Sequence, residues 1–235
     1  MSTVYLVPSL LAESATESIP SYVIKYVKEC SVIFAENERS ARRFLKKMDR
    51  EIIIDNYEWY TIHKSEKEQL STFTAKIKEG KNIAIISEAG CPGIADPGQI
   101  LIAAAQKLGC RVQPLVGPSA VLLALMASGF SGQQFEFAGY LPIDPGERQK
   151  RLKALESSSS NNDSTKIFIE TPFRNNQLLE SILKTCLPST LLCLGIEITS
   201  GEENIKTLSV GEWKKAIPDL HKKQVIFLLY AAGPL

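Results

Sequence analysis

Residues 87–98 read Ser-Glu-Ala-Gly-Cys-Pro-Gly-Ile-Ala-Asp-Pro-Gly, and this stretch is the strongest indication of the fold. It joins a predicted strand at Ile83–Ile86 to a predicted helix at Ile100–Leu108. Glycine allows the main chain to turn sharply and to approach a ligand closely. Amide groups at the helix start, near Pro97, are suited to receive an anion or a carboxylate. The composition fits either a ligand-binding turn or an elaborate connection between a strand and a helix.

A second turn of this kind lies at Gly117–Ala120, which reads Gly-Pro-Ser-Ala. It follows a predicted strand at Val112–Leu115 and precedes an apolar helix that contains Val121–Met126. Most segments of this type are ordinary helix caps, with Ser119 as the capping residue here. Both turns leave the carboxyl ends of strands that we expect to be neighbours, and open α/β sheets bind ligands at that edge.

On both sides of these turns, the first half of the chain alternates apolar predicted strands with segments whose apolar residues repeat at helical spacing. The predicted strands there are Val4–Val7, Val32–Ala35, Ile52–Ile54, Ile83–Ile86 and Val112–Leu115. This alternation is typical of a mainly parallel sheet covered by helices. The second half orders its strands and helices differently, so we expect an α/β protein of two unlike domains, residues 1–116 and 117–235. We expect Ser157–Ser164 (SSSSNNDS) to form a flexible surface loop.

Composition and charge exclude several classes of protein. Lys and Arg total 27 against 26 for Asp and Glu, and the net charge of +1 argues against coating nucleic acid by bulk charge. The five cysteines are scattered without a C-x-x-C pair, which predicts no disulfide framework, no zinc site and a reducing, cytoplasmic compartment. With two histidines, neither a metal cluster nor a Ser-His-Asp triad is expected. We find no G-x-G-x-x-G after the first strand, no P-loop, no signal peptide and no membrane-spanning apolar run.

Two predicted helices carry clusters of basic residues. The first cluster comprises Arg39, Arg42, Arg43, Lys46, Lys47 and Arg50, and the second comprises Arg148, Lys150, Arg151 and Lys153. A solvated helix face is the ordinary explanation for each cluster. Arg148 differs because helical spacing places it on one face with Leu152 and Leu155, and an inward arginine is suited to clamp a phosphate or a carboxylate.

A further segment, Glu170-Thr171-Pro172-Phe173-Arg174, follows one predicted strand and precedes a predicted helix. Glu170 would lie at the edge of a sheet. Arg174 is either a surface residue of the first helical turn or a ligand contact.

Together and in this order, the segments resemble the tetrapyrrole (corrin/porphyrin) methylase superfamily. Within it they are most similar to the branch that methylates a ribose 2′-hydroxyl of small-subunit ribosomal RNA (RsmI-like). The resemblance covers nearly the whole chain. It is carried by VYLVPS (4–9), VIFAENERSARRFL (32–45), SEAGCPGIADPG (87–98), GPSAVLLALMASG (117–129), FAGYLPIDPGERQKRL (137–152), FIETPFR (168–174) and IEITSGEENIKTLSVGEW (196–213).

The resemblance implies a methyltransferase that binds S-adenosyl-L-methionine in the cleft between two unlike α/β domains. It further implies a homodimer, a ribosomal RNA or small-subunit substrate, no metal and no membrane. By position, cofactor contacts would come from Pro8, Ser87, Glu88, Ala89, Gly90, Gly93, Ile94, Ser119, Ala120, Glu170 and Thr171. Asp96 and Pro97 would brace the loop. Because a hydroxyl nucleophile benefits from a base or an electrostatic partner, the catalytic candidates are Glu36, Glu38, Arg39 and Glu170.

Several residues depart from the family's pattern, and they bear on the substrate more than on the fold or the cofactor. The departures include the first loop, SLLAES at 9–14, and the residues Asn37, Glu88 and Phe173. Three functions therefore stay open. The whole-chain resemblance and the basic helices favour a ribosomal RNA methyltransferase. The near-neutral charge and the altered first loop favour a tetrapyrrole-like small-molecule methyltransferase, and the altered motif residues favour a non-catalytic paralogue that binds S-adenosylmethionine.

Overall fold

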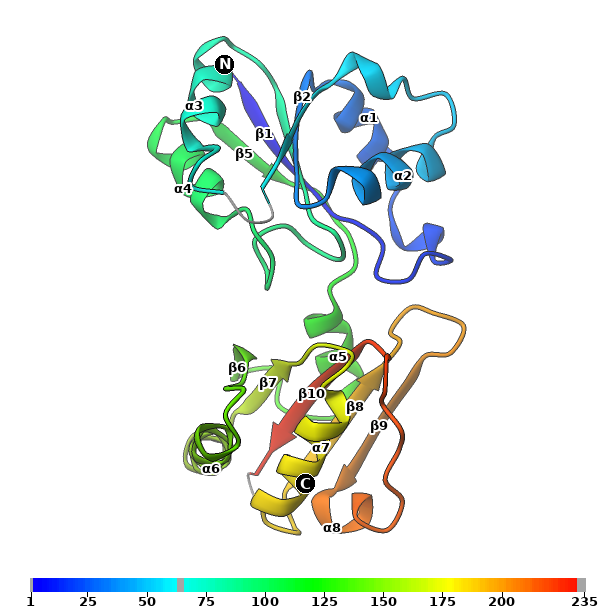
Figure 1. The fold of residues 1–235 in the computed structure, drawn as a ribbon, viewed down its shortest axis with the longest axis vertical. Coiled ribbons are helices and arrows are strands. Elements are labelled where there is room, and N and C mark those ends of the chain that lie inside the picture. Colours follow the sequence, from blue (N-terminus) through cyan, green and yellow to red (C-terminus); the bar gives the residue numbers. More distant parts are fainter. Residues whose placement is uncertain (1, 63–65, 232–235) are drawn as a thin grey trace. The chain divides into compact units, whose positions relative to one another are not determined.

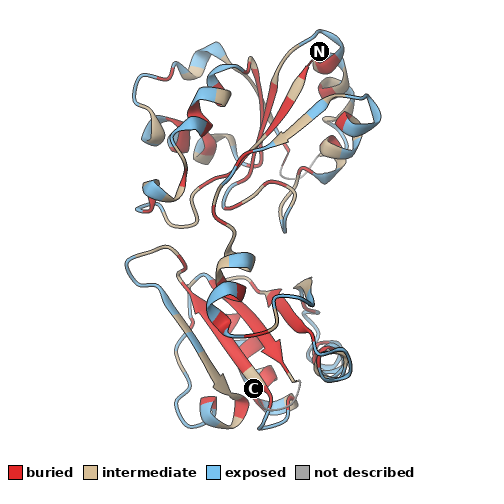
Figure 2. Ribbon diagram, turned by 180° about the vertical axis from the view of Figure 1, so that it is seen from behind, coloured by how far each residue is buried: buried red, intermediate tan, exposed pale blue. Residues whose placement is uncertain are grey.

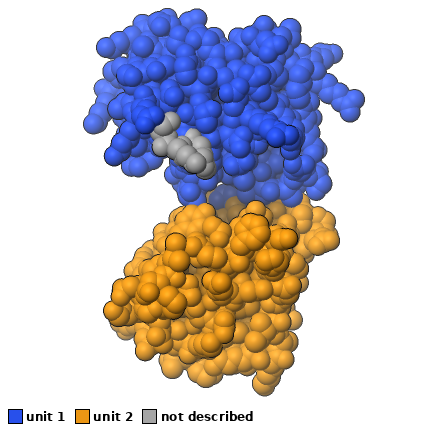
Figure 3. All heavy atoms as spheres, viewed as in Figure 1, with its two compact units in different colours: residues 1–119 blue, residues 120–235 orange. Residues whose placement is uncertain are grey.

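The computed structural model describes residues 2–62 and 66–231, and the chain forms two compact units, residues 1–119 and 120–235 (Figure 3). Each unit contains one five-stranded sheet with helices packed against it (Figure 1). Buried residues follow the strands, and exposed residues follow the outer faces of the helices (Figure 2). No helix within the described ranges is both long and apolar enough to cross a bilayer.

The first unit is built on a sheet whose strands all run parallel. Its strands are β1 (Thr3–Val7), β2 (Val32–Ala35), β3 (Glu58–Thr61), β4 (Ile83–Ile86) and β5 (Arg111–Pro114), in the spatial order β3-β2-β4-β1-β5. The helices are α1 (Tyr22–Lys28), α2 (Glu38–Met48), α3 (Leu70–Lys78) and α4 (Gln99–Lys107). This order makes the carboxyl ends of β2, β4, β1 and β5 neighbours at one edge of the sheet.

Alternate residues of these strands face two separate cores. Ile33 and Ala35 of β2 pack in the core beneath α1 and α2, whereas Val32 and Phe34 pack in the core beneath α3 and α4. Strands that are buried on both faces are apolar throughout, which is why these segments read as unbroken apolar runs in the sequence.

The second unit has a mixed sheet. Its strands are β6 (Phe135–Tyr140), β7 (Thr165–Ile169), β8 (Leu191–Ile196), β9 (Asn204–Ser209) and β10 (Val225–Tyr230), in the spatial order β6-β7-β10-β8-β9. Only β6 and β7 pair in parallel, and the other three pairs are antiparallel. The helices are α5 (Ala120–Ser128), α6 (Pro145–Asn162), α7 (Asn175–Thr185) and α8 (Val210–Trp213). This architecture confirms the predicted class of two unlike α/β parts.

The strand predicted at Ile52–Ile54 is wrong. Ile52 is buried, but Ile53 is 59% exposed and a 3-10 turn occupies Ile54–Asn56. Ile52 lies in the core, and the partly buried Ile54 and Tyr57 pack against the same core. The strand β3 forms after the turn, where it pairs in parallel with β2.

The prediction of a flexible loop at Ser157–Ser164 is also wrong, because α6 continues to Asn162. Ser159 is fully buried, and its hydroxyl donates to the Ser164 carbonyl at 2.7 Å and accepts from the Ala231 amide at 2.8 Å. The Asn162 side chain donates back to the Ser158 carbonyl at 3.0 Å. These bonds hold a polar segment of low helix propensity in the last turns of α6.

Candidate functional site

The loops that leave β1 and β4 are joined by main-chain hydrogen bonds at the carboxyl edge of the first sheet. Ser9 and Gly90 form an isolated antiparallel bridge, with N–H to carbonyl distances of 2.8 and 3.2 Å. The Ser9 hydroxyl donates to the Ser87 carbonyl at 2.7 Å, and the Ser87 hydroxyl donates to the Gly90 carbonyl at 2.9 Å. Both serines are buried, so they fix the loop shape and leave the exposed Glu88 and Ala89 facing outward.

The turn after β5 contacts the same pair of loops. A Cβ atom on Gly117 would lie 2.2 Å from the Pro8 Cβ atom, so only glycine permits this approach. The Cys91 thiol lies 3.5 Å from the Pro118 carbonyl oxygen, with hydrogen-bonding geometry. The prediction that the two glycine-rich turns leave neighbouring strands is wrong, because β1 lies between β4 and β5. The loops after β1, β4 and β5 are nevertheless packed together.

The loop at 87–98 keeps an unusual main-chain conformation. Gly90 has φ 73°, and Ala95, which is not a glycine, has φ 65°. A residue with a Cβ atom in the left-handed region loses about 1 kcal/mol relative to glycine. The loop therefore holds a strained residue next to Asp96.

The amides at the start of α4, after Pro97, receive a carboxylate of the chain itself, which is one of the two kinds of group expected there. The amides of Ile100 and Leu101 donate to one carboxylate oxygen of Glu66, at 2.7 and 3.1 Å. The chain thus supplies its own anion to this helix terminus.

Three carboxyl groups lie near one another beside this edge. Glu36, directly after β2, is buried and accepts the Glu88 amide at 2.9 Å. The Glu88 carboxylate accepts hydrogen bonds from the Asn37 amide group at 3.4 Å and the Ser40 hydroxyl at 3.2 Å. Burial, together with the charges of Glu36 and Glu88, raises the pKa of Asp96 to about 7. The edge therefore carries negative charge, and one of its carboxyl groups exchanges a proton near neutral pH.

The other two catalytic candidates of the first unit lie on the first turn of α2. Glu38 forms an ion pair with Arg42 at 2.7 Å, and Arg42 also lies 4.9 Å from the Trp59 ring centroid. Arg39 is exposed. Glu38 is therefore occupied by a neighbour, whereas the buried Glu36 lies closest in sequence to the strand end.

The remaining candidates lie in the second unit, around the turn after β7. One oxygen of the Glu170 carboxylate accepts from the Thr171 amide at 2.6 Å and from two nitrogens of Arg174, at 3.1 and 2.6 Å. The other oxygen, Oε2, is buried and has no hydrogen-bond partner within the described structure. Nearby in sequence, the Oδ1 atom of the fully buried Asn175 also lacks a partner there. Arg174 is thus a partner of Glu170, and the turn and the start of α7 each have one buried acceptor atom without a donor among the described residues.

Arg148 lies inward with Leu152 and Leu155, as its spacing predicts. Its Nε atom donates to the Ser181 hydroxyl at 3.0 Å and its Nη1 atom to the Ile143 carbonyl at 3.1 Å. The first bond joins α6 to α7 and the second joins α6 to the turn before it, so the role of Arg148 in the structure is to hold these segments together.

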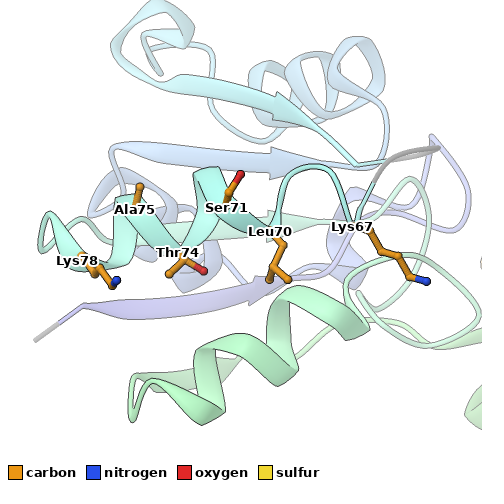
Figure 4. A pocket seen from close by; sticks show the side chains of 6 residues that line it. All are labelled: Lys67, Leu70, Ser71, Thr74, Ala75 and Lys78. Carbon is orange, nitrogen blue, oxygen red and sulfur yellow. The ribbon is translucent and has the colours of Figure 1, made fainter.

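Two surface hollows are lined by other residues. One of about 520 Å³ runs along α3 and the turn before it (Figure 4), and its lining residues are Lys67, Leu70, Ser71, Thr74, Ala75 and Lys78. The other, of about 660 Å³, lies beside α7 and includes Leu179, Leu183 and Ile217. Neither contains a predicted site residue.

The structure places the predicted residues in two groups. The first unit holds Pro8, Ser87, Glu88, Ala89, Gly90, Gly93, Ile94 and Ser119, with Glu36, Glu38 and Arg39. The second unit holds Ala120, Glu170 and Thr171. Sequence reasoning missed Ser9, Ser40 and Asn175. Of these, Ser9 could have been found, since it follows Pro8 at a strand end, whereas the partners of Ser40 and Asn175 come from distant segments.

The first unit is a parallel sheet with joined glycine-rich loops at its carboxyl edge, and the second is a mixed α/β unit. These units form the two-part α/β class of protein that the sequence motifs indicate. The sequence model of the family described as Tetrapyrrole (Corrin/Porphyrin) Methylases matches residues 14–213. The chain belongs to this family. The family match confirms the prediction of a methyltransferase.

Two relatives and one solved structure illustrate the similarity. "Ribosomal RNA small subunit methyltransferase I" of Escherichia coli O157:H7 is 31% identical over 229 residues, which cover 96% of this chain and 76% of that protein. The protein of the same name from Halalkalibacterium halodurans is 33% identical over 182 residues, 77% of this chain and 59% of that protein. The uroporphyrin-III C-methyl transferase of Thermus thermophilus, complexed with S-adenyl homocysteine, superposes with a TM-score of 0.59 at 14% identity, over 97% of each chain.

Proposed function

We propose that the protein transfers a methyl group from S-adenosylmethionine to small-subunit ribosomal RNA, and that the acceptor is a ribose 2′-hydroxyl. The observation that carries the RNA substrate is the 31% identity to the Escherichia coli small-subunit methyltransferase over 96% of the chain. The names of these relatives support RNA as the substrate, and the ribose hydroxyl as acceptor goes beyond what the names state. We also propose that the protein works as a cytoplasmic homodimer.

Each unit, taken by itself, has residues that fit S-adenosylmethionine as the cofactor. The cofactor carries a sulfonium and an ammonium cation, and the carboxyl groups of Glu36, Glu88 and Asp96 provide negative charge at the edge of the first sheet. Its amino and hydroxyl groups are hydrogen-bond donors, and the unpaired Oε2 of Glu170 is a buried acceptor. A buried acceptor without a donor is costly, so a ligand that supplies one gains affinity.

The cofactor supplies a methyl group bound to a good leaving group, the sulfonium sulfur. The protein therefore has to align the acceptor with this methyl group and exclude water. The joined loops after β1, β4 and β5 are suited to hold a fixed position. Glu36 is the candidate for accepting the hydroxyl proton, because the Glu88 amide orients its carboxylate at 2.9 Å and the side chain is buried. A carboxylate in this role contributes about 10²- to 10⁴-fold in rate.

Methyl transfer to RNA is the direct test. The purified protein should incorporate tritiated methyl groups into small ribosomal subunits from a strain without this modification, and digestion of the RNA should release a 2′-O-methylated nucleoside. Transfer to porphyrin precursors but not to RNA would replace this proposal with a small-molecule reaction. Binding of S-adenosylmethionine without transfer to either substrate would indicate a non-catalytic paralogue.

A matched pair of variants tests the cofactor assignment. Glu170→Gln keeps the size of the side chain and should weaken S-adenosylmethionine binding by about 10- to 100-fold in calorimetry. Glu180→Gln makes the same change at an exposed residue of α7 that pairs with Lys184 at 2.6 Å, and it should leave the affinity unchanged. Equal affinity in both variants would remove Glu170 from the site.

A further inference from the structure

The helix α2 carries a local concentration of positive charge. Residues 38–50 contain six Lys or Arg and two acidic residues, although the whole chain has a net charge of +1. The rest of the chain is therefore net negative. The charge of α2 is a local feature, not a consequence of a basic composition.

The basic side chains of this helix gather on one face. The basic face of α2 comprises four exposed residues, Arg39, Arg43, Lys46 and Lys47. At 3.6 residues per turn they fall within an arc of about 100°. Ala41, Phe44 and Leu45 are buried on the opposite side of the helix. The whole basic face therefore points to solvent, while the opposite side of the helix packs in the core of the first unit.

Carboxylates of the chain leave this face largely unneutralised. Arg43 lies 3.5 Å from Glu13, whose side chain is 80% exposed, and such exposed pairs contribute little. Among the described residues, no carboxylate lies within 4.0 Å of Arg39, Lys46 or Lys47. The Lys46 ammonium donates to the Arg50 carbonyl at 3.1 Å and interacts with Asp49 without forming an ion pair, because Asp49 pairs with Lys28.

The second basic cluster, on α6, behaves differently. Arg148 is buried, Lys150 pairs with Glu147 at 2.8 Å, and Arg151 pairs with Glu136 at 3.2 Å. The two helices look alike in the sequence, but only α2 presents a row of mainly unpaired cations.

The position of α2 relates this row to the candidate site. The helix begins at Glu38, directly after Glu36 and the capping residue Asn37, whose side chain accepts the Arg39 and Ser40 amides. The row of cations thus starts at the carboxyl edge of the first sheet and extends away from it. The start of a helix adds a partial positive charge there.

Phosphate groups of RNA are the anions that fit this surface. An interfacial membrane helix needs a free apolar face to enter the bilayer, and the apolar face of α2 is buried in the core. Arg and Lys side chains are among the groups with which proteins contact nucleic-acid phosphates.

We propose that the basic face of α2 binds the phosphate backbone of the RNA substrate and guides the acceptor nucleotide to the carboxyl edge of the first sheet. This inference rests on the proposed function and assigns the part of the molecule that holds the RNA. Arg43, Lys46 and Lys47 contact phosphates, and Arg39 lies nearest the candidate site.

The test compares two triple variants that lose the same charge. The first is Arg43→Gln with Lys46→Gln and Lys47→Gln, and the control is Lys150→Gln with Arg151→Gln and Lys153→Gln. Affinity for a fluorescein-labelled single-stranded fragment of small-subunit RNA is measured by anisotropy from about 50 to 200 mM salt. Three lost phosphate contacts should reduce the slope of log K against log salt by about 2 and weaken binding by about 10- to 100-fold near 0.1 M salt.

The control variant should keep the slope of the unaltered protein. Both variants should bind S-adenosylmethionine with unchanged affinity, which shows that they are folded. A slope that is unchanged in the α2 variant, or reduced equally in both, overturns the inference. If the inference about α2 is overturned but the unaltered protein methylates RNA, the proposed function stands without this inference.

Two further outcomes separate the alternatives. An unaltered protein that neither binds nor methylates RNA removes the proposed function and this inference together. Vesicles of phosphatidylcholine with phosphatidylserine serve as the competing anionic surface. Salt-sensitive vesicle binding that the α2 variant abolishes, with RNA binding intact, would make α2 a lipid site and refute the RNA assignment.

Discussion

Replacing Asp96 by asparagine should stabilise the first unit at pH 8 and leave its stability unchanged near pH 4. The pKa of this carboxyl rises from its ordinary value of 3.8 to about 7, first through burial and then through the charges of Glu36 and Glu88. Between these two values the folded protein binds a proton that the unfolded chain does not bind. Stability therefore falls as the pH rises through this window, and an uncharged asparagine escapes the loss.

The size of the effect follows from the pKa shift and from solvent screening. The full shift corresponds to about 4 kcal/mol at pH 8. Asp96 is only half-buried, so water screens its charge, and we expect a gain of about 1–2 kcal/mol in the free energy of unfolding. Urea unfolding at several pH values, followed by hydrogen exchange of the β4 amides, measures this gain in the first unit alone.

Asp219 provides a control of opposite sign. Hydrogen bonds from the Asn176 side chain and the His221 amide lower the pKa of Asp219, so Asp219→Asn should reduce stability at neutral pH and lose this effect in acid. If Asp96→Asn were no more stable than the unaltered protein at pH 8, or were equally stabilised at pH 4, the reasoning about the carboxyl cluster would be refuted.

Three other substitutions test the packing. Gly117→Ala places a Cβ atom 2.2 Å from that of Pro8, so it should destabilise the first unit by about 1–3 kcal/mol in urea unfolding. The same variant should bind S-adenosylmethionine more weakly in calorimetry. Unchanged stability and unchanged affinity would contradict the contact. Ala95→Gly should relieve the strain of φ 65° and raise stability by about 0.5–1 kcal/mol, and a decrease would argue against that conformation. Ser159→Ala removes both buried hydrogen bonds of its hydroxyl and should destabilise the second unit by about 1–3 kcal/mol, with faster hydrogen exchange in the last turns of α6. Unchanged exchange there would mean that the helix end is held by other contacts.

Much of the fold could be predicted from the sequence because its strands have an unambiguous pattern. The four-residue apolar runs at Val32–Ala35 and Ile83–Ile86 are buried on both faces, and short apolar runs of this kind are typical of buried strands. The run at Ile52–Ile54 has the same composition but only one buried side chain. Whether a short apolar run pairs with a neighbour depends on where the turn at Asp55 places the chain, and local composition does not contain that information.

The polar end of α6 illustrates a second limit. Serine and asparagine favour loops because their side chains compete for main-chain hydrogen bonds. Here tertiary contacts reverse that preference, since Ser159 bonds to Ser164 and to Ala231, which lies far along the chain. The partner could not be found from the local sequence.

For the candidate site, the sequence indicated which loops carry the chemistry and the structure shows how they are held. The glycine-rich composition pointed to the loops after β4 and β5. It did not indicate that Glu66 would occupy the start of α4, because that contact joins residues more than 30 positions apart. It also could not distinguish the two basic helices, since ion pairs such as Arg151 with Glu136 depend on tertiary structure.

The bridge between Ser9 and Gly90 bears on how fast a ligand is captured. The loops after β1 and β4 would otherwise fluctuate independently, but here they share a pair of main-chain hydrogen bonds. A ligand that binds at this edge therefore loses little free energy in ordering these loops. Association at this edge should then proceed at a rate governed by encounter, with no slow rearrangement afterwards. Affinity differences among cofactor analogues would appear mainly as differences in residence time.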